Sequence, residues 1–362
     1  MKNSLLNNKI FFVYKKYKKG GYYINNAKKA LNKLGLKIRI VENLSLFEII
    51  FSKKGTIFHI HFPEEMYNSN SQLWRLIRAF WTMLQLLIIK IKGSVIVWTL
   101  HDTVPHEPFN TSKIDIFIRK ILSRFARLVF IHSIYSGREL HRYYNKKVNS
   151  ILVPHGNYIN FWGNSKISRT FARNKLGVKK GAFVYLFFGR IRQYKGVDNL
   201  IKAFKKMEEP NLNLIIAGVP AGSNWDIKQN KKNILDFISN DERILPHLKW
   251  IEKRDVSTYF NAADVVVLPF ERITNSGSLI TAISFGKPFV IPNKKTLLEL
   301  VNKNGGIIYD PKNSNGLEKA IKKIRRKNLG RMSKENYRIA IAMSWKKFAE
   351  KTIEGYKSIN KV

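Results

Sequence analysis

The chain has 362 residues, of which 44% are hydrophobic and 12% aromatic, so it can bury a large core and its length suits two domains. It holds 65 Lys and Arg against 25 Asp and Glu, which gives a formal net charge of +40, and it has no Cys. This composition indicates a globular protein and excludes disulfides, thiolate chemistry and cysteine-ligated metal sites.

The excess of positive charge has two interpretations. Lys, Asn and Ile are frequent throughout the chain, which a coding bias would produce by itself. The functional interpretation is attraction to a polyanion such as nucleic acid, anionic lipid or a phosphorylated substrate. No apolar run reaches the roughly 20 residues of a spanning helix, and residues 1–13 lack the apolar core of a signal peptide. We therefore expect a protein that neither crosses a bilayer nor leaves the cell by that route.

The first half alternates short apolar runs with helical patterns. One predicted helix, 26–34, ends at Gly35, and another begins after residue 133 with a capping box formed by Ser136 and Glu139. Strands that alternate with helices predict a parallel sheet with both faces covered. The expected strands are residues 10–14, 37–42, 56–62, 95–102, 128–133 and 150–156.

Two further helices of the first half are strongly apolar and basic. Residues 73–91 are mostly apolar, and their polar exceptions follow one narrow stripe: Arg75, Arg78, Thr82 and Gln85. Residues 114–128 present one apolar face and a second face with Lys and Arg. Such helices suit a lipid interface, and the alternative, favoured for residues 73–91, is that they simply cover the sheet of the first domain.

The second half repeats the pattern, with strands expected at 183–189, 212–218, 248–251, 265–270, 288–292 and 305–310. Helices are expected at 197–207, 256–264 and 278–285, and two more at 333–357. We predict an α/β fold in which two Rossmann-like, doubly wound parallel-sheet domains, 1–165 and 166–335, precede a C-terminal helical segment, 336–362.

Ligands of open α/β sheets bind beyond the carboxyl ends of the strands, so the residues there are the first candidates for chemistry. The first strand is followed by a basic loop that ends in Gly20 and Gly21, before a helix. Glycine lets backbone N–H groups approach a phosphate, and a helix N-terminus adds its dipole. Glycine pairs are also common in ordinary turns.

Several strand ends of the first half carry histidine together with carboxylates. Such a set predicts an acid/base site, although a single histidine at a strand end is usually a structural hydrogen bonder. A metal cluster competes with this interpretation, but no tight metal-ligand spacing such as HExxH occurs. The residues are His59, His61, His101, Asp102, His106, Glu107, His132 and His155.

Two loops of the second half resemble anion cradles. The segment FFGRIRQYKG places Gly189, Arg190, Lys195 and Gly196 in the turn after a strand, where two cations suit a diphosphate. A second strand leads to Glu271, whose carboxylate could accept hydrogen bonds from sugar hydroxyls. Ordinary helix capping is the alternative for the small residues that follow it, which are Thr274, Asn275, Ser276, Gly277 and Ser278.

These segments resemble the group 1 glycosyltransferases of GT-B fold, well over residues 182–325 and more loosely over the first half. In that family the stretch that resembles GRIRQYKGVDNLIKAF holds the donor diphosphate, here through Arg190 and Lys195. NAADVVVLPFERITNSGSLITAISFGKPFVIP resembles the family's donor-sugar stretch. The family's pair of Glu residues eight apart is altered, because Thr281 stands at the second position and Glu271 is offset from the first. SWKKFAEKTIEGY resembles the terminal helix that crosses back to the first domain, and HIHFPEE and VWTLHDTVPHE resemble acceptor-side segments.

The resemblance implies transfer of a sugar from a UDP- or GDP-sugar, bound by Gly21, Arg190, Lys195, Glu271 and residues 275–278, to a lipid-linked or polysaccharide acceptor. It implies no metal and no cofactor, since cations and helix dipoles would neutralise the leaving diphosphate. An inverting reaction needs a base, for which Asp102, His101 and Glu107 are the candidates, whereas a retaining reaction needs none. Acceptor contacts are expected from His59, His61, His106 and His155.

The positive net charge also predicts where the protein acts, which is the anionic inner face of the cell membrane. There it would take part in the synthesis of a surface polysaccharide or glycolipid. Three rival functions remain open. A basic nucleic-acid-binding protein would use the charge, but no nucleic-acid-binding motif is present, so we expect no specific nucleic acid partner. A protein of this fold that binds sugar nucleotides or lipids without catalysis is the second rival, and an epimerase or phosphorylase is the third.

Overall fold

The computed structural model describes residues 10–13, 21–42, 44–69, 71–102, 113–163, 167–220 and 224–359. They form two compact units. Unit 1 comprises residues 1–156 and 343–362, and unit 2 comprises residues 157–342. The sequence prediction had placed the divisions after residues 165 and 335.

Unit 1 is built on a six-stranded sheet in which every pairing is parallel, in the order β2-β1-β3-β4-β5-β6. The strands β1, β3 and β5 are buried along their whole length, as expected for a sheet covered on both faces. The strands are β1 (Ile10–Val13), β2 (Ile38–Val41), β3 (Ile57–His61), β4 (Val95–Leu100), β5 (Leu128–Ile131) and β6 (Ser150–Leu152).

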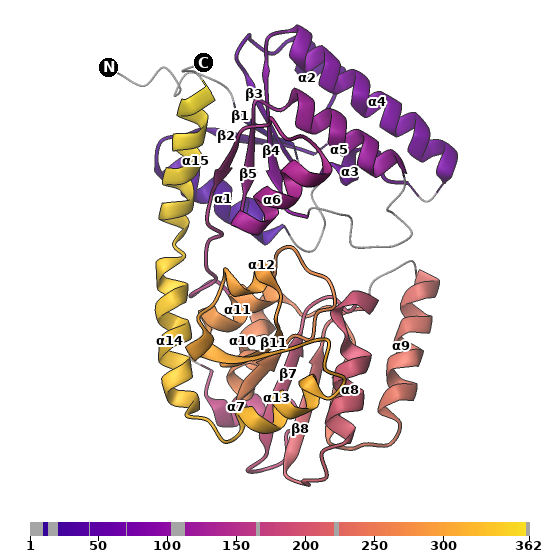
Figure 1. The fold of residues 1–362 in the computed structure, drawn as a ribbon, viewed down its shortest axis with the longest axis vertical. Coiled ribbons are helices and arrows are strands. Elements are labelled where there is room, and N and C mark those ends of the chain that lie inside the picture. The colour runs from indigo at the N-terminus through magenta and orange to yellow at the C-terminus, as the bar shows by residue number, and fades with distance from the viewer. Residues whose placement is uncertain are drawn as a thin grey trace. The chain divides into compact units, whose positions relative to one another are not determined.

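Helices cover both faces of this sheet (Figure 1). On one face α1 packs beside α15, and their apolar residues join those of β1, β4 and β5 in one core cluster. The other face lies under α2, α4, α5 and α6. The helices are α1 (Tyr22–Lys33), α2 (Leu46–Ile50), α3 (Glu64–Tyr67), α4 (Gln72–Ile91), α5 (Lys113–Phe125), α6 (Ile134–Tyr143) and α15 (Trp345–Ile359).

Unit 2 also has six parallel strands, in the order β12-β11-β10-β7-β8-β9. Read in chain order, this is the Rossmann arrangement, in which the order reverses between the first strand, β7, and the fourth, β10. The strands are β7 (Phe183–Phe188), β8 (Leu212–Ala217), β9 (Ile244–His247), β10 (Val265–Val267), β11 (Phe289–Pro292) and β12 (Gly306–Tyr309).

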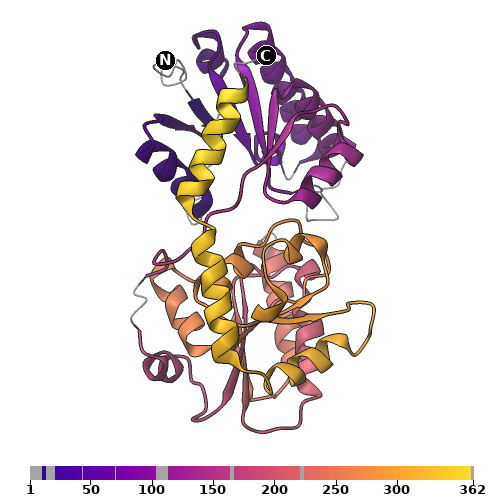
Figure 2. The same cartoon turned by 60° about the vertical axis from the view of Figure 1, so that its left-hand side comes forward.

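The helices of unit 2 alternate with these strands. They are α7 (Arg169–Lys175), α8 (Val197–Lys205), α9 (Asn224–Ile238), α10 (Val256–Ala262), α11 (Gly277–Ser284), α12 (Lys295–Leu298), α13 (Gly316–Ile324) and α14 (Leu329–Ala342). Short 3-10 turns occur at Gln193–Lys195, Lys253–Asp255 and Lys303–Gly305. Helix α14 packs on α11, and the chain then returns to unit 1 through α15, the last yellow helix of Figure 2.

Most predicted elements are present, and two local predictions are wrong. The helix after β5 starts at Ile134 and is capped by Ser133, whose Oγ accepts a hydrogen bond from the Ser136 amide at 3.0 Å. Ser136 therefore lies inside the helix, since the earlier serine already satisfies the free amide. The strand expected at 248–251 is β9, four residues earlier. No helix of the described ranges is long and apolar enough to cross a membrane.

Close packing of α15 on the sheet gives a stability prediction. A Cβ at Gly355 would lie 2.3 Å from Cε1 of Phe130, which is buried in the sheet. We expect Gly355→Ala to lower the free energy of unfolding by about 1–3 kcal/mol, because the helix has to move away from the strand.

Urea unfolding followed by circular dichroism measures this effect. Gly330→Ala on α14 is the matched control, because its nearest neighbour would be 3.5 Å away and Ala favours helix by up to about 1 kcal/mol. Equal stability of the two variants would contradict the packing described here.

Candidate functional site

The switch point of unit 2 brings the two predicted anion cradles together. Gly189 follows β7 with φ of 133°, and a Cβ built on it would meet Ser278 Oγ at 2.7 Å and Lys195 Nζ at 3.2 Å. The Ser278 hydroxyl at the start of α11 and the Lys195 ammonium in the turn before α8 thus converge over Gly189, which has no side chain. Only glycine leaves this space open, which is what a phosphate held by backbone and side chains requires.

The loops that carry these groups are fixed by further close backbone approaches. Gly196 has φ of 65° and begins α8, and a Cβ there would lie 2.4 Å from the Pro269 carbonyl oxygen. The Glu271 amide donates to the Tyr194 carbonyl oxygen at 2.8 Å, which ties the loop after β10 to the loop after β7. Helices α8 and α11 therefore both begin at the same edge of the sheet, where the positive ends of their dipoles favour an anion.

The remaining predicted donor residues have different surroundings. Arg190 is exposed beside Gly189, and Ser276 caps α11 by accepting from the Leu279 amide at 3.1 Å. Glu271 accepts a hydrogen bond from Asn199 Nδ2 at 3.0 Å and lines a separate 650 Å³ pocket between α8 and α13. Thr281, at the position of the family's second Glu, is buried and donates to the Gly277 carbonyl oxygen at 2.7 Å.

In unit 1 the strand-end histidines form one aromatic cluster around Tyr23 of α1. The Tyr23 hydroxyl lies 3.1 Å from His132 Nε2, and its ring contacts those of His101, His132 and His155 at centroid distances of 4.8–5.4 Å. Burial lowers the pKa of His132 to about 4 and that of His155 to about 3. These rings are neutral at pH 7 and are therefore weak proton acceptors.

The individual histidines differ in their freedom to meet a ligand. His59 has both ring nitrogens engaged, with Tyr356 Oη and Thr99 Oγ1, each at 2.6 Å. His61 Nδ1 lies 3.1 Å from His101 Nε2, and burial lowers the pKa of both rings. The other nitrogen of His61, Nε2, is buried and has no hydrogen-bond partner among the described residues. A buried unpaired nitrogen is costly, so His61 is the histidine best suited to bind a ligand.

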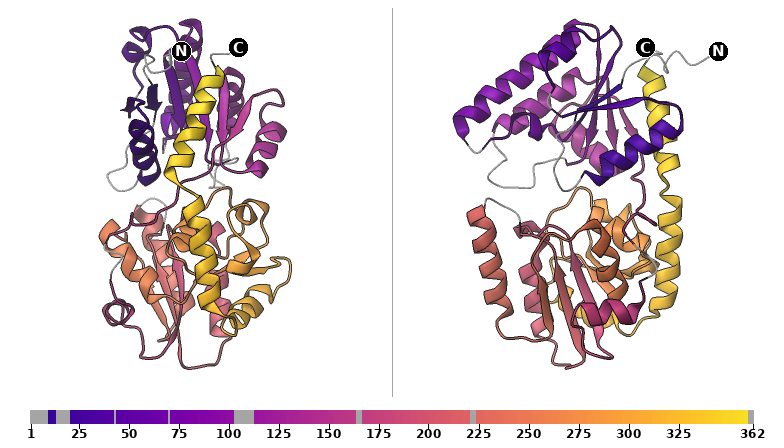
Figure 3. Two further views of the ribbon diagram at one scale, coloured as in Figure 1. Left: turned by 90° about the vertical axis from the view of Figure 1, so that its left-hand side faces the viewer. Right: turned by 180° about the vertical axis from the view of Figure 1, so that it is seen from behind.

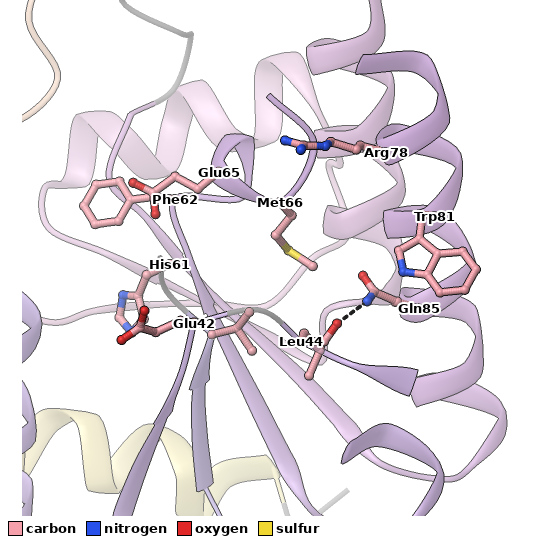
Figure 4. Close-up of a pocket in the computed structure, with 10 residues that line it drawn as sticks. Glu42, Leu44, His61, Phe62, Glu65, Met66, Arg78, Trp81 and Gln85 are labelled. Atoms are coloured by element: carbon pink, nitrogen blue, oxygen red, sulfur yellow. Dashed lines mark hydrogen bonds between the residues drawn. The ribbon is translucent and has the colours of Figure 1, made fainter. Parts of the chain in front are cut away.

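His61 faces a pocket of about 290 Å³ at the carboxyl ends of β1, β2 and β3, which is the switch point of this sheet (Figure 4). Phe62 also lines it and has φ of 47°, a strained backbone conformation that is typical of binding sites. The lining consists of Val13, Glu42, Leu44, His61, Phe62, Glu65, Met66, Arg78, Trp81 and Gln85.

Sequence reasoning missed most of this pocket. Glu42 follows β2 directly and Glu65 lies in α3, four residues after β3, so a search of all strand ends could have found them. The residues predicted there from the sequence were mainly histidines. Arg78, Trp81 and Gln85 come from α4, and only the packing of that helix reveals their position.

The other predicted residues of unit 1 are placed as follows. Asp102 follows β4, and its carbonyl oxygen accepts from Arg119 Nη1 at 2.9 Å. Arg119 is itself buried against Glu64 at 2.8 Å. Gly21 begins α1 with φ of 72°. The basic loop 15–20, His106 and Glu107 lie outside the described residues. Within the described ranges no three His, Asp or Glu are placed to hold a metal ion.

Comparison with known proteins finds a family match in unit 2. Residues 168–340, slightly less than half of the chain, match the model of the glycosyl transferases group 1. The matched segment contains β7, Gly189, Lys195 and Ser278, so the cradle described above lies inside it.

One similar curated protein is the GDP-mannose:glycolipid 4-beta-D-mannosyltransferase of Xanthomonas campestris pv. campestris, 27% identical over 250 residues. The match covers 68% of this chain and 64% of that protein's length.

Similar solved structures are sucrose-phosphate synthase of Thermosynechococcus elongatus and HepE of Anabaena in complex with UDP and glucose. The first has a TM-score of 0.78 at 16% identity and covers 98% of this chain and 99% of that one. The second has a TM-score of 0.75 at 17% identity and covers 97% and 100%. The predicted fold class, GT-B with two doubly wound parallel sheets, is confirmed.

The neutral histidine cluster predicts a pH-dependent stability. Between pH 6.5 and about 4 the unfolded chain protonates His132 while the native chain does not, so stability is full above pH 6.5 and falls as the pH is lowered. Between pH 7.5 and pH 5 this one group should lower the free energy of unfolding by about 2 kcal/mol.

Urea unfolding of wild type and His132→Asn at both pH values measures the difference. The variant has no group to titrate at this position, so its loss of stability should be smaller by about that amount. The same loss in both proteins would show that His132 is not held neutral.

Proposed function

We propose that the chain is a glycosyltransferase that binds the diphosphate of a nucleotide sugar over Gly189 and transfers the sugar to an acceptor hydroxyl. The observation that carries this proposal is the convergence of Lys195 Nζ and Ser278 Oγ over that glycine, at the switch point of a Rossmann-type sheet. The match of residues 168–340 to the model of the glycosyl transferases group 1 supports it.

The reaction breaks the bond between the sugar's anomeric carbon and the diphosphate, and negative charge develops on the leaving phosphate oxygen. Lys195, Arg190 and the N-termini of α8 and α11 would stabilise that charge. With this positive charge supplied by the protein, we propose a reaction that needs no divalent cation and no cofactor. Transfer that is unchanged by EDTA is the expected result, and restoration by Mg²⁺ after chelation would contradict it.

For the donor we propose a GDP- or UDP-sugar. The Xanthomonas relative is named for GDP-mannose, and the Anabaena structure contains UDP and glucose. Neither the altered Glu pattern nor buried Thr281 favours guanine or uracil as the nucleobase of the donor. Titration with GDP and with UDP decides between the two.

For the acceptor we propose a lipid-linked or saccharide hydroxyl that enters unit 1 at the 290 Å³ pocket. The unpaired His61 Nε2 would hydrogen-bond a sugar hydroxyl there. If the reaction inverts configuration, a carboxylate is a better base than a histidine whose pKa is depressed by burial. Of the predicted bases Asp102, His101 and Glu107, we therefore favour Asp102 among the described residues. Glu42 and Glu65 line the pocket.

The net charge of +40 supports a peripheral position on the anionic inner face of the cell membrane, in the synthesis of a surface polysaccharide or glycolipid. The name of the glycolipid-acting relative agrees with this setting.

Removing Lys195 tests the donor site. We expect Lys195→Ala to weaken binding of GDP or UDP about tenfold to a hundredfold, because a charge-assisted contact to phosphate is worth about 1.5–3 kcal/mol. Isothermal titration calorimetry at fixed salt measures the affinity.

Lys180→Ala is the matched control. It removes the same charge from the exposed loop before β7, at the opposite end of that strand, and should bind as wild type does. Equal weakening in both variants would show that only the overall charge attracts the nucleotide. No nucleotide binding by any of the proteins, together with salt-sensitive RNA binding, would favour a nucleic-acid-binding function instead.

A further inference from the structure

Helix α4 turns two residues of its polar stripe toward the protein. Thr82 is 1% exposed and Gln85 is 4% exposed, and Gln85 Nε2 donates to the Leu44 carbonyl oxygen. Arg78, in the same stripe, is exposed and donates through Nη1 to the Asn68 carbonyl oxygen at 3.0 Å. The buried side of the helix is therefore partly polar and is completed by Ala79, Leu86 and Ile89.

The opposite side of the helix is apolar and exposed. Phe80 is 62% exposed and Ile91 is 74% exposed. We call this surface the α4 face, and it consists of Leu73, Ile77, Phe80, Leu87 and Ile91, with Trp74 and Trp81 along one side. Helix α4 itself lies on the outer side of its unit (Figure 1; Figure 3, right).

The neighbouring helices also expose large apolar residues. Helices α2 and α5 both pack against α4. Phe47 and Phe51 at α2 are 68% and 71% exposed, and Phe117 on α5 is 55% exposed. So many exposed apolar residues on three adjoining helices indicate a binding surface.

The charges around the α4 face indicate the partner. Its exposed cations include Lys53, Lys54, Lys90, Lys92, Lys120 and Arg124. The acidic residues of the three helices are Glu48, which is paired with Arg39, and Asp115, which is buried. Two copies joined through this face would oppose cation to cation, whereas anionic lipid headgroups would neutralise them while the apolar residues enter the acyl boundary.

We propose that the α4 face docks on an anionic lipid bilayer, with the helix lying in the interface. The same helix supplies Arg78 and Gln85 to the 290 Å³ pocket, together with Trp81 from the edge of the α4 face. One helix thus separates the lipid from the pocket. Building on the function proposed above, the acceptor is an amphiphile whose lipid chain stays in the bilayer while its sugar occupies the pocket.

Vesicle flotation tests the docking directly. Ile77→Ser/Phe80→Ser should partition to phosphatidylglycerol-containing vesicles about tenfold or more weakly than wild type, because two exposed apolar side chains no longer enter the interface. Phe171→Ser on α7 is the matched control, since Phe171 is 57% exposed in unit 2, and it should float as wild type does. Pure phosphatidylcholine vesicles should bind all three proteins weakly.

Unchanged flotation of the double variant would overturn the proposal. So would sedimentation showing that the double variant turns a dimer into a monomer while its flotation stays the same, because the α4 face would then bind a second copy. Nucleotide titration and circular dichroism of the double variant verify that it is folded.

A second measurement tests the acceptor. With acceptor embedded in vesicles the double variant should lose transfer rate in proportion to its binding, and with a water-soluble, short-chain acceptor it should match wild type. Equal loss of transfer rate with both acceptors would contradict the proposal that docking on the bilayer brings the acceptor's sugar to the pocket. If no protein transfers sugar to either acceptor, the function proposed above fails, while flotation still decides whether the α4 face docks.

Discussion

The reversal of strand order between β7 and β10 is the constraint on which the donor site depends. The chain leaves these two neighbouring parallel strands toward opposite faces of the sheet, which leaves a crevice at their carboxyl ends. The loops that follow β7 and β10 both line this crevice. Here those loops approach so closely that a side chain is excluded, since a Cβ at Gly196 after β7 would lie 2.4 Å from the carbonyl oxygen of Pro269 after β10. Lys195 and Ser278 reach the same point because Gly189, which lies beneath them, has no side chain.

Unit 1 uses the same principle with different chemistry. Its sheet order reverses between β1 and β3, and the 290 Å³ pocket lies there. Beside it the histidine rings and Tyr23 form a packed aromatic layer whose burial keeps the imidazoles neutral. The pocket carries both signs of charge, from Glu42, Glu65 and Arg78, and such a mixed lining suits hydrogen bonds to an uncharged sugar, while the cations of unit 2 suit a diphosphate. This difference agrees with the acceptor and donor roles proposed for the two units.

Strand positions and the parallel topology could be predicted because buried parallel strands are continuous apolar runs. Gly189 and Lys195 could be predicted because they follow such a run directly. The pocket could not, since Trp81 and Gln85 reach it only through the packing of α4. The polar stripe of α4 was visible in the sequence, but periodicity does not tell which side of a helix faces the protein. The hydrogen bond that the Glu271 carboxylate accepts from Asn199 of α8 could not be predicted either, because the two residues lie 72 positions apart in the chain.

Hydrogen–deuterium exchange of the intact chain, with and without saturating GDP or UDP, tests the central claim most directly. The account predicts that the bound nucleotide slows exchange in residues 189–197 and 274–280, the two loops that converge over Gly189. Nucleotide binding with no protection in either segment, or with protection confined to unit 1, would contradict it.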